Sequence, residues 1–423
     1  MLNRKADPDT SAGPEREGET LLSSRSSERF ERRRADIVAA AIPVLNGQGF
    51  KGMRLTAVAE LIGLKATGVT YYFPRKEELA VACLECGMAI IHDLLAIAER
   101  EPDARTRIAR FIELFVERDA AVRSGEATPL ASFGAIRALE GQHYDRVTEA
   151  YKQMFRRVRA LFESPELDSV DRVGRSIRTI VLLEQLYWAN IWLGDYDIDE
   201  FPRLAQRMTD IIADGLAPEG ATFDPGELKL RGAADGADAA KEAFLLAATR
   251  QINAHGYRGA SVERISASLN VTKGAFYHHN EAKDDLVAAC FRRSFAIVRD
   301  AQRQVRGSGA GEWWRLITAV TALIRFQLSA EGPLLRTAVL SSMPHEHQVE
   351  IMSSSYKTSR HFASMIADAI SEGSVRSIDP AVAGPLFSAA INVASDVRMT
   401  QMATHDRVVR DYARPLFNGL VKP

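Results

Sequence analysis

Apolar residues recur at helical spacing along almost the whole chain. Segments 105–122, 175–193, 312–328 and 360–373 place them at i, i+3, i+4 and i+7, which is the pattern of amphipathic helices. The pattern breaks at short clusters of Gly, Pro or Asp, which are typical of turns. No segment shows a convincing alternation of apolar and polar residues. The sequence therefore predicts an all-α protein.

The same pattern of apolar positions occurs twice. Residues 49–83 align with residues 256–290 without a gap, at an offset of 207 positions. Identical pairs include Gly49 with Gly256 and Cys83 with Cys290, and most other apolar positions keep their character. A period this long indicates a duplicated domain rather than the short unit of a solenoid.

Each copy has the pattern of a helix-turn-helix. In the second copy, an amphipathic helix ends at Gly256, and Ser261 can cap a short helix over 262–269. A tight turn, Asn-Val-Thr, precedes the segment KGAFYHH, which begins another short helix. Two short helices joined by a turn and supported by a preceding helix form the arrangement that presents its second helix to the DNA major groove.

The stretch 256–286, GYRGASVERISASLNVTKGAFYHHNEAKDDL, resembles the N-terminal DNA-binding domain of the tetracycline-repressor (TetR) family. The stretch 49–79, GFKGMRLTAVAELIGLKATGVTYYFPRKEEL, resembles the same domain more loosely. The resemblance implies two TetR-type units in tandem, each with a three-helix head and a helical regulatory domain. The predicted division is a disordered tail at 1–28, a first head at 29–84, a first regulatory domain at 85–216, a linker at 217–238, a second head at 239–291 and a second regulatory domain at 292–423.

Carried over position by position, the resemblance implies DNA contacts in both heads. In the first head the residues are Arg54, Lys65, Ala66, Thr67, Thr70, Tyr71, Tyr72 and Lys76. In the second head they are Ser261, Thr272, Lys273, Gly274, Tyr277, His278, His279 and Lys283. The candidates for base edges are Lys65, Thr70, Tyr71 and Lys273, and those for phosphate oxygens are Tyr72, Lys76, His279 and Lys283. Adjacent histidines on a helix point apart, so phosphate contact is favoured over metal binding.

Both heads depart from the family pattern. Arg54 stands where a capping Ser or Thr is usual, and Thr67 and Thr70 replace Gly and Tyr. Asn280 replaces the Phe that Phe73 supplies in the first head, where it normally anchors the reading helix. Loss of that anchor costs on the order of 3 kcal/mol unless Asn280 caps the next helix.

Charge is local rather than global, because the formal net charge is only −1. Residues 25–34, RSSERFERRR, carry five arginines just before the first head, and no such cluster precedes the second. Such an arm can add salt-dependent affinity for the DNA backbone. The alternative is an ordinary solvated helix start.

A TetR-type head needs a partner about one DNA turn away. By resemblance, the helix pairs 172–194 with 200–216 and 380–402 with 407–420 would pack together in one chain as a pseudo-dimer. A homodimer of the fused chain with four heads is the alternative. The resemblance also implies a ligand-responsive repressor with a small apolar effector. Helix packing is the favoured interpretation of the clustered aromatic residues, and effector contact is the alternative. The candidate effector contacts are Tyr187, Trp188, Trp192, Trp313, Trp314 and Phe326.

Other classes of protein find less support. We see no membrane-spanning run, no secretory signal and no enzyme motif, and we expect no cofactor, no metal and a cytoplasmic location. Cys83 and Cys86 form a lone C-x-x-C within an apolar helix, which favours core cysteines over a redox or metal site. The competing function is a helical ligand-binding or protein-interaction module whose heads no longer bind DNA.

Overall fold

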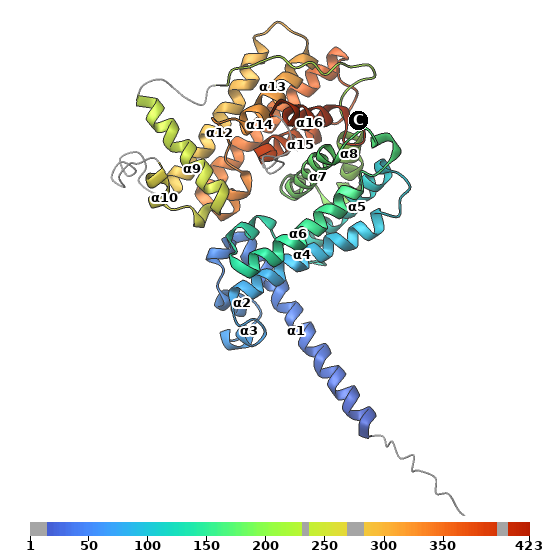
Figure 1. Ribbon diagram of the computed structural model, residues 1–423, viewed down its shortest axis with the longest axis vertical. Helices are drawn as coiled ribbons and strands as arrows, with labels where there is room; N and C mark the ends of the chain where they lie inside the picture. The colour runs from blue at the N-terminus through green and yellow to red at the C-terminus, as the bar shows by residue number, and fades with distance from the viewer. Residues whose placement is uncertain (1–14, 231–236, 269–282, 396–404) are drawn as a thin grey trace, which may run out of the picture.

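The computed structural model describes residues 15–230, 237–268, 283–395 and 405–423. Within these residues all regular secondary structure is helical, as the hydrophobic spacing predicts (Figure 1). In the first half the α-helices are α1 (Glu15–Gly52), α2 (Leu55–Leu61), α3 (Ala66–Tyr72), α4 (Lys76–Ala98), α5 (Ala104–Arg123), α6 (Gly141–Ala160), α7 (Arg172–Trp192) and α8 (Phe201–Asp214). Short 3-10 turns lie between them, of which η1 (Phe133–Ala138) is the longest in this half.

The second half repeats the order of elements. Its α-helices are α9 (Ala237–Gly259), α10 (Val262–Ser268), α12 (Lys283–Arg306), α13 (Glu312–Leu328), α14 (His345–Glu372), α15 (Pro380–Val393) and α16 (His405–Asn418). The 3-10 turn η5 (Thr337–Ser342) precedes α14 as η1 precedes α6. We call residues 29–84 and 239–291 the first and second heads, and residues 85–216 and 292–423 the first and second bodies.

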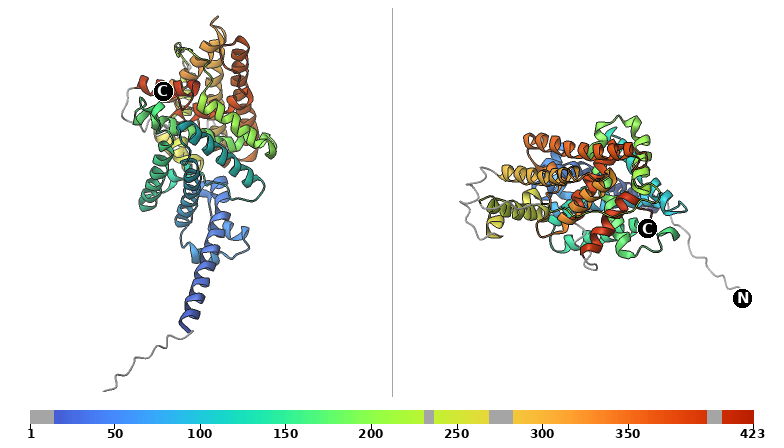
Figure 2. Two further views of the ribbon diagram at one scale, coloured as in Figure 1. Left: turned by 90° about the vertical axis from the view of Figure 1, so that its right-hand side faces the viewer. Right: turned by 90° about the horizontal axis from the view of Figure 1, so that it is seen from above.

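The support helix of each head bends at the glycine that the sequence analysis singled out. Gly49 in α1 has φ 64° and Gly256 in α9 has φ 72°, a region of backbone space that side chains with a Cβ seldom occupy. The tail predicted at 1–28 differs from the structure, because α1 already begins at Glu15. The N-terminal part of this helix projects beyond the packed helices (Figure 2). Charged Glu and Arg residues are good helix formers, and this explains the early start.

An asparagine fastens each head to its own body in the same way. Asn46 donates from Nδ2 to the Leu130 carbonyl at 2.8 Å and accepts from the Ser132 amide at 2.8 Å. Asn253, which aligns with Asn46, donates to the Leu334 carbonyl at 2.9 Å and accepts from the Arg336 amide at 3.0 Å. The two bodies thus correspond at an offset of 204 in this region, and each loop leads into its 3-10 turn.

The two bodies meet through four helices, which we call the junction: α7, α8, α15 and α16. Helix α7 packs against α15 and α16, and α8 packs against α15. Two ion pairs cross the junction in a reciprocal manner. Asp171 caps α7 and pairs with Arg407 of α16, while Asp379 caps α15 and pairs with Arg207 of α8.

The ends of α8 and α16 approach each other at two glycines. The Leu216 amide donates to the Phe417 carbonyl at 2.6 Å, and the Leu420 amide donates to the Ile212 carbonyl at 2.8 Å. A Cβ on Gly215 would lie 2.3 Å from backbone atoms of residues 417–419, and one on Gly419 would lie 2.2 Å from the Ala213 carbonyl oxygen. Both glycines also have positive φ, so no other residue fits either position without distortion.

The described part of the predicted linker is packed, rather than free as its composition predicts. Gly226 donates from its amide to Thr318 Oγ1 at 2.9 Å, and a Cβ on Gly226 would lie 2.2 Å from the Trp314 ring. Trp313 Nε1 donates to the Thr222 carbonyl at 2.9 Å, and Leu230 is buried. Residues 217–230 are therefore a strap across α13 that holds the second body beside the first.

Helix α4 is the core helix of the first half. By length and composition it is apolar enough to cross a membrane, although half of its most apolar window is buried inside the protein. Cys83 lies on the buried side of α4, and burial raises the pKa of its thiol to about 12. Cys86 is partly exposed, and burial raises the pKa of its thiol as well. No group of three metal-binding side chains occurs among the described residues, and the C-x-x-C pair belongs to the packing of α4.

Candidate nucleic-acid interface

The first head presents the exposed face of α3. Val69 and Phe73 are buried, which fixes the helix against the head at roughly 1.5–3 kcal/mol for each side chain. Lys65, Thr67, Thr70 and Tyr71 are exposed, and Tyr71 has 72% of its surface accessible. The spacing of residues 67, 70 and 71 places them on one side of the helix. Ala66 and Tyr72 are half-buried beside this face.

Arg54 precedes α2 and makes no side-chain cap, in agreement with the expectation from its chemistry. Its side chain is exposed, and its position at a helix N-terminus suits a phosphate contact. Thr70 Oγ1 donates to the Thr67 carbonyl at 3.1 Å, which leaves the lone pairs of the hydroxyl available to a ligand.

An aromatic cluster joins the arginine arm to the reading helix. The Phe30 ring lies 4.7 Å from the Tyr72 ring and 6.1 Å from the Tyr71 ring, and the two tyrosine rings are 5.1 Å apart. The Arg34 guanidinium lies 5.0 Å from the centre of the Phe73 ring. Sequence reasoning found the arginines but missed Phe30, whose only signal is one aromatic residue inside a charged run.

The lysines predicted to meet phosphate occupy equivalent places in the two heads. Lys76 Nζ lies 4.7 Å from the Phe50 ring centre, and Lys283 Nζ lies 4.9 Å from the ring centre of the aligned Tyr257. A cation over an aromatic face is held in position at a modest gain of about 0.5–1 kcal/mol. Each ammonium group therefore has a fixed place at the start of α4 or α12.

The described part of the second head agrees with the predicted motif. Ser261 Oγ accepts from the Arg264 amide at 3.2 Å, which is the cap expected for α10. The other predicted contacts of this head, Thr272, Lys273, Gly274, Tyr277, His278 and His279, lie outside the described residues, as does Asn280.

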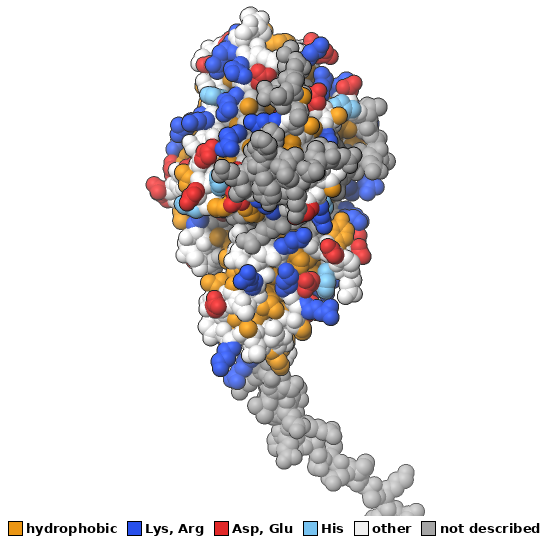
Figure 3. Space-filling model, turned by 90° about the vertical axis from the view of Figure 1, so that its left-hand side faces the viewer, with side chains coloured by type: hydrophobic (Ala, Val, Ile, Leu, Met, Phe, Trp, Pro, Cys, Tyr) orange, Lys and Arg blue, Asp and Glu red, His pale blue; other side chains and the backbone are white. Residues whose placement is uncertain are grey.

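In Figure 1 the first head, with α2 and α3, lies at the lower end of the packed helices, and the second head, with α9 and α10, lies on the left side of the molecule. Figure 3 faces this side and shows Lys and Arg side chains spread over it among acidic ones, with exposed hydrophobic side chains toward its lower end. Exposed apolar residues of the first head include Phe30, Leu61 and Tyr71. Positive charge and aromatic surface thus occur together on the first head, which suits a polyanion with stacked bases.

Five of the six aromatic residues predicted to contact an effector pack against other parts of the protein, and the sixth lines a cavity. Tyr187 lies against Phe115 and Phe133, and Trp192 is buried beside Tyr196. Trp313 and Trp314 hold the strap 217–230, and Phe326 lies under the Arg293 guanidinium. Of the six candidates, Trp188 lines a cavity, of about 50 Å³, in the second body.

A larger open cleft of about 340 Å³ lies at the junction between α7 and α16. Its buried arginine, Arg178, donates to the carbonyls of Leu420 and Lys422 at 3.0 and 2.7 Å. Arg407, also in the wall, pairs with Asp171 and Asp411. These groups already bind the backbone or each other, so the cleft belongs to the packing of the junction.

Residues 244–290 match the model of the DNA-binding domain described as "Bacterial regulatory proteins, tetR family". The matched residues lie in the second head, which contains Gly256, the capped α10 and Lys283. These findings show a tetR-type DNA-binding domain over residues 244–290. The TetC protein of transposon Tn10 from Escherichia coli is 42% identical over 43 residues, and the regulator RutR from Escherichia coli K12 is 35% identical over 68 residues. The chain spans 22% and 32% of these two relatives, and the matches cover 10% and 16% of this chain.

Two solved structures of regulators show a lower likeness. A putative fatty acid metabolism regulator of Clostridium perfringens has a TM-score of 0.35 and 15% identity, covering 42% of this chain and 97% of that one. AibR, in complex with isovaleryl coenzyme A and operator DNA, has a TM-score of 0.35 and 19% identity, covering 42% of this chain and 96% of that one.

Proposed function

We propose that this protein is a sequence-specific DNA-binding transcriptional regulator in which two unlike TetR-type heads on one chain read one operator. The observation that carries the proposal is the tetR-family match over the second head together with the same internal geometry in the first. Both heads have a positive-φ glycine in the support helix, a lysine over an aromatic ring and an asparagine fastened to the body.

The junction supports a covalent pseudo-dimer. Two ion pairs join the cap of α7 to α16 and the cap of α15 to α8. The bond from the Ala217 amide to the Phe417 carbonyl, at 2.9 Å, recurs from the Val421 amide to the Ala213 carbonyl, at 3.3 Å. Such exchange is what a two-fold interface requires, since each contact occurs twice with the partners interchanged. In this arrangement one chain supplies both heads, and its operator has two unlike half-sites.

The heads contribute differently to binding. In the first, the arginine arm and the exposed face of α3 supply charge and base contacts, with Lys65, Thr70 and Tyr71 at the bases. In the second, Lys273 and Tyr277 are the corresponding candidates. Tyr72, His279, Lys76 and Lys283 bind phosphate, which fixes the register of the protein on the duplex.

The test is a gel shift on the protein's own promoter DNA, combined with light scattering to count chains in the complex. Wild type is compared with Lys65→Ala/Tyr71→Ala and Lys273→Ala/Tyr277→Ala. We expect one chain per site and a loss of affinity of about tenfold or more in both double mutants. The control is Tyr144→Ala/Lys152→Ala, which removes the same residue types from the exposed surface of α6.

Each alternative has its own outcome. Two chains per site would replace the pseudo-dimer by a four-headed homodimer. If one double mutant binds like wild type, that head does not read DNA. If wild type gives no shift at low salt, the regulator is rejected in favour of a helical ligand-binding module.

A further inference from the structure

The geometry points to a single effector site per chain, in the second body. We propose that this site takes one small, uncharged organic molecule with a hydrogen-bonding end, and that its occupancy acts on the second head alone. The inference rests on the proposed function only for the response of DNA binding, because the site itself is defined without DNA.

The cavity lies between the two halves. Helices α12, α14 and α15 and the loop before η5 form its walls, and Trp188 of α7 reaches in from the first half. Phe295, Leu335 and Phe362 supply apolar surface. Its volume of about 50 Å³ has room for roughly three to five water-sized spheres, so the ligand has only a few non-hydrogen atoms.

The polar groups of the wall are hydroxyls and an amide. They are Ser294, Thr337, Ser355, Thr358, Ser388 and Asn392. No charged side chain is among the residues that line the cavity. Because an ion moved into such a site would lose its hydration without gaining a counter-charge, the wall selects neutral molecules.

The first body has the same framework but carries larger side chains in the corresponding place. The residues aligned with Thr337 and Ser355 are Phe133 and Tyr151, whose ring centres are 5.6 Å apart. Phe133 also lies 5.7 Å from Tyr187. Gly87, aligned with Ser294, gives Phe133 room, since a Cβ there would lie 3.4 Å from the ring. Aromatic side chains thus occupy the region of the first body where the second has its cavity.

The loop that lines the cavity also carries the second head. Leu334, Leu335 and Thr337 face the cavity, while Asn253 of α9 binds the loop at residues 334 and 336. Ser294 Oγ accepts from the Leu335 amide at 2.8 Å, and Asn392 Oδ1 accepts from the Thr337 amide at 3.0 Å. A ligand that displaces the loop therefore pulls on α9 directly.

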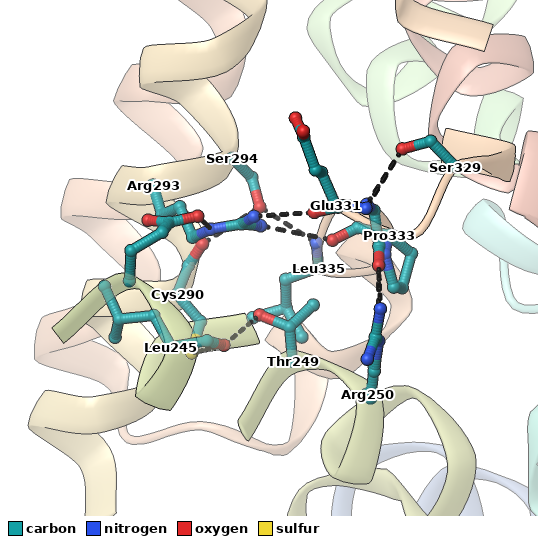
Figure 4. A network of polar contacts seen from close by, with 12 residues as sticks. Leu245, Thr249, Arg250, Cys290, Arg293, Ser294, Ser329, Glu331, Pro333 and Leu335 are labelled. Atoms are coloured by element: carbon teal, nitrogen blue, oxygen red, sulfur yellow. Dashed lines mark hydrogen bonds and ion pairs between the residues drawn. The ribbon is translucent and has the colours of Figure 1, made fainter. Parts of the chain in front are cut away.

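Figure 4 shows how closely α9, α12 and this loop are joined. Arg293 of α12 donates to the Glu331 carbonyl at 2.9 Å and to the Pro333 carbonyl at 3.2 Å. Arg250 of α9 donates to the Gly332 carbonyl at 3.3 Å. The residues aligned with Arg250 and Arg293 in the first half are Pro43 and Cys86, which have no such donors. The two arginine contacts from the loop to α9 and α12 are therefore specific to the second half, whereas the asparagine contact occurs in both halves.

The first experiment tests the chemical class of the ligand. Binding of 1-butanol, butanoate and n-butylammonium to the full-length protein is measured by saturation-transfer NMR without DNA. We expect 1-butanol to bind at least about tenfold more tightly than either ion, a difference of about 1.4 kcal/mol. Equal or tighter binding of an ion, or no signal from 1-butanol, would overturn the proposal.

The location is tested by copying the first body into the second. Thr337→Phe/Ser355→Tyr should lose the 1-butanol signal while thermal unfolding stays cooperative. Ser353→Tyr, on the exposed side of the same helix α14, should keep it. If the double variant fails to fold, Ser355→Tyr alone serves, with the same expected loss. Retention of the signal in folded filled variants would show that the ligand sits elsewhere.

The connection to the head is tested on promoter DNA. We expect 1-butanol to weaken binding by wild type, and Asn253→Ala to bind 1-butanol without this response. Asn46→Ala, the matched change in the first half, should respond like wild type. The coupling is wrong if Asn253→Ala still responds, or if Asn46→Ala loses the response too. Failure of wild type to bind DNA at all would reject the proposed function instead, and the NMR result would still decide the site.

Discussion

The two halves share a framework and differ in what surrounds it. The first head carries an arm whose Phe30 packs on the reading helix, and its body is filled by Phe133 and Tyr151. No arginine cluster precedes the second head in the sequence, but Arg250 and Arg293 add polar contacts between this head and a loop that lines a cavity, beyond the asparagine contact that both halves share. If both proposals above hold, this difference predicts a division of labour, in which the first half contributes tight DNA contact and the second half the response to a ligand.

The largest effect is expected where the halves meet. Gly215→Ala places a Cβ 2.3 Å from the backbone of α16 and its exit, in a backbone conformation with φ 75°. Strain and overpacking together should lower the free energy of unfolding by roughly 3 kcal/mol, measured by urea denaturation. A shared junction predicts that both halves lose stability together.

Gly220→Ala is the matched control for this change. Gly220 has a similar φ of 78°, but a Cβ there would meet nothing within 4 Å. Its cost should be limited to backbone strain, at about 1–2 kcal/mol. Equal losses in the two variants would mean that the close approach of α8 and α16 contributes nothing.

The next effect concerns the arm of the first head. Arg29 and Arg32 are exposed on α1 beside the reading helix. Replacing both by Gln should reduce the slope of log affinity against log salt concentration by about 1.8, if each contacts one phosphate. Fluorescence anisotropy with promoter DNA over a salt series measures the slope.

Arg100→Gln/Arg203→Gln provides the comparison for the arm, since both residues are exposed on the first body. This variant should keep the wild-type slope. An unchanged slope in the arm variant would mean that the arginine run is an ordinary solvated helix start and does not contact DNA.

The smallest effect is a dependence of the junction on pH. The amide of Gly174, and then Arg407, hold the pKa of Asp171 below its ordinary value of 3.8. Asp171 therefore adds stability that is fully present above pH 3.8 and is lost as pH falls through the lower, folded pKa. Because the pair is exposed, we expect less than about 1 kcal/mol.

Urea denaturation of wild type and Asp171→Asn, at pH 5 and at successively lower pH values down to acid unfolding, measures how the free energy of unfolding depends on pH. This series spans the ordinary pKa of Asp, near 3.9. The variant should be less stable at pH 5 and should converge with wild type in acid. A constant difference at all pH values would assign the effect to lost helix capping rather than to the titration.

Much of the fold follows from local chemistry. The bends at Gly49 and Gly256 and the cap at Ser261 were predictable, because each depends on one residue type in one backbone setting. The ranges of α7, α8 and α16 lie close to those predicted, because long amphipathic periods give a strong helical signal. Helix α15 begins at the predicted residue 380 but ends at Val393 rather than at 402.

Features that depend on tertiary partners were not predictable. Composition indicated a free linker, but Trp313 and Trp314 bind the strap through contacts that no local pattern encodes. The Asn46 and Asn253 contacts escaped detection because a lone polar residue gives no periodic signal, and the offset changes from 207 to 204 beyond them. The correspondence of Phe133 and Tyr151 with two residues that line the cavity of the second body depends on this shifted register, which the structure alone fixes.

The junction also sets an order of events during synthesis. Helices α7 and α8 leave the ribosome about two hundred residues before α15 and α16, which cover them. At a synthesis rate of about 5–20 residues per second, the apolar faces of α7 and α8 remain unpaired for on the order of 10–40 seconds. During this interval the nearest matching surface belongs to a neighbouring nascent chain on the same messenger. Translation speed between residues 217 and 405 therefore influences whether a chain closes on itself or pairs with its neighbour.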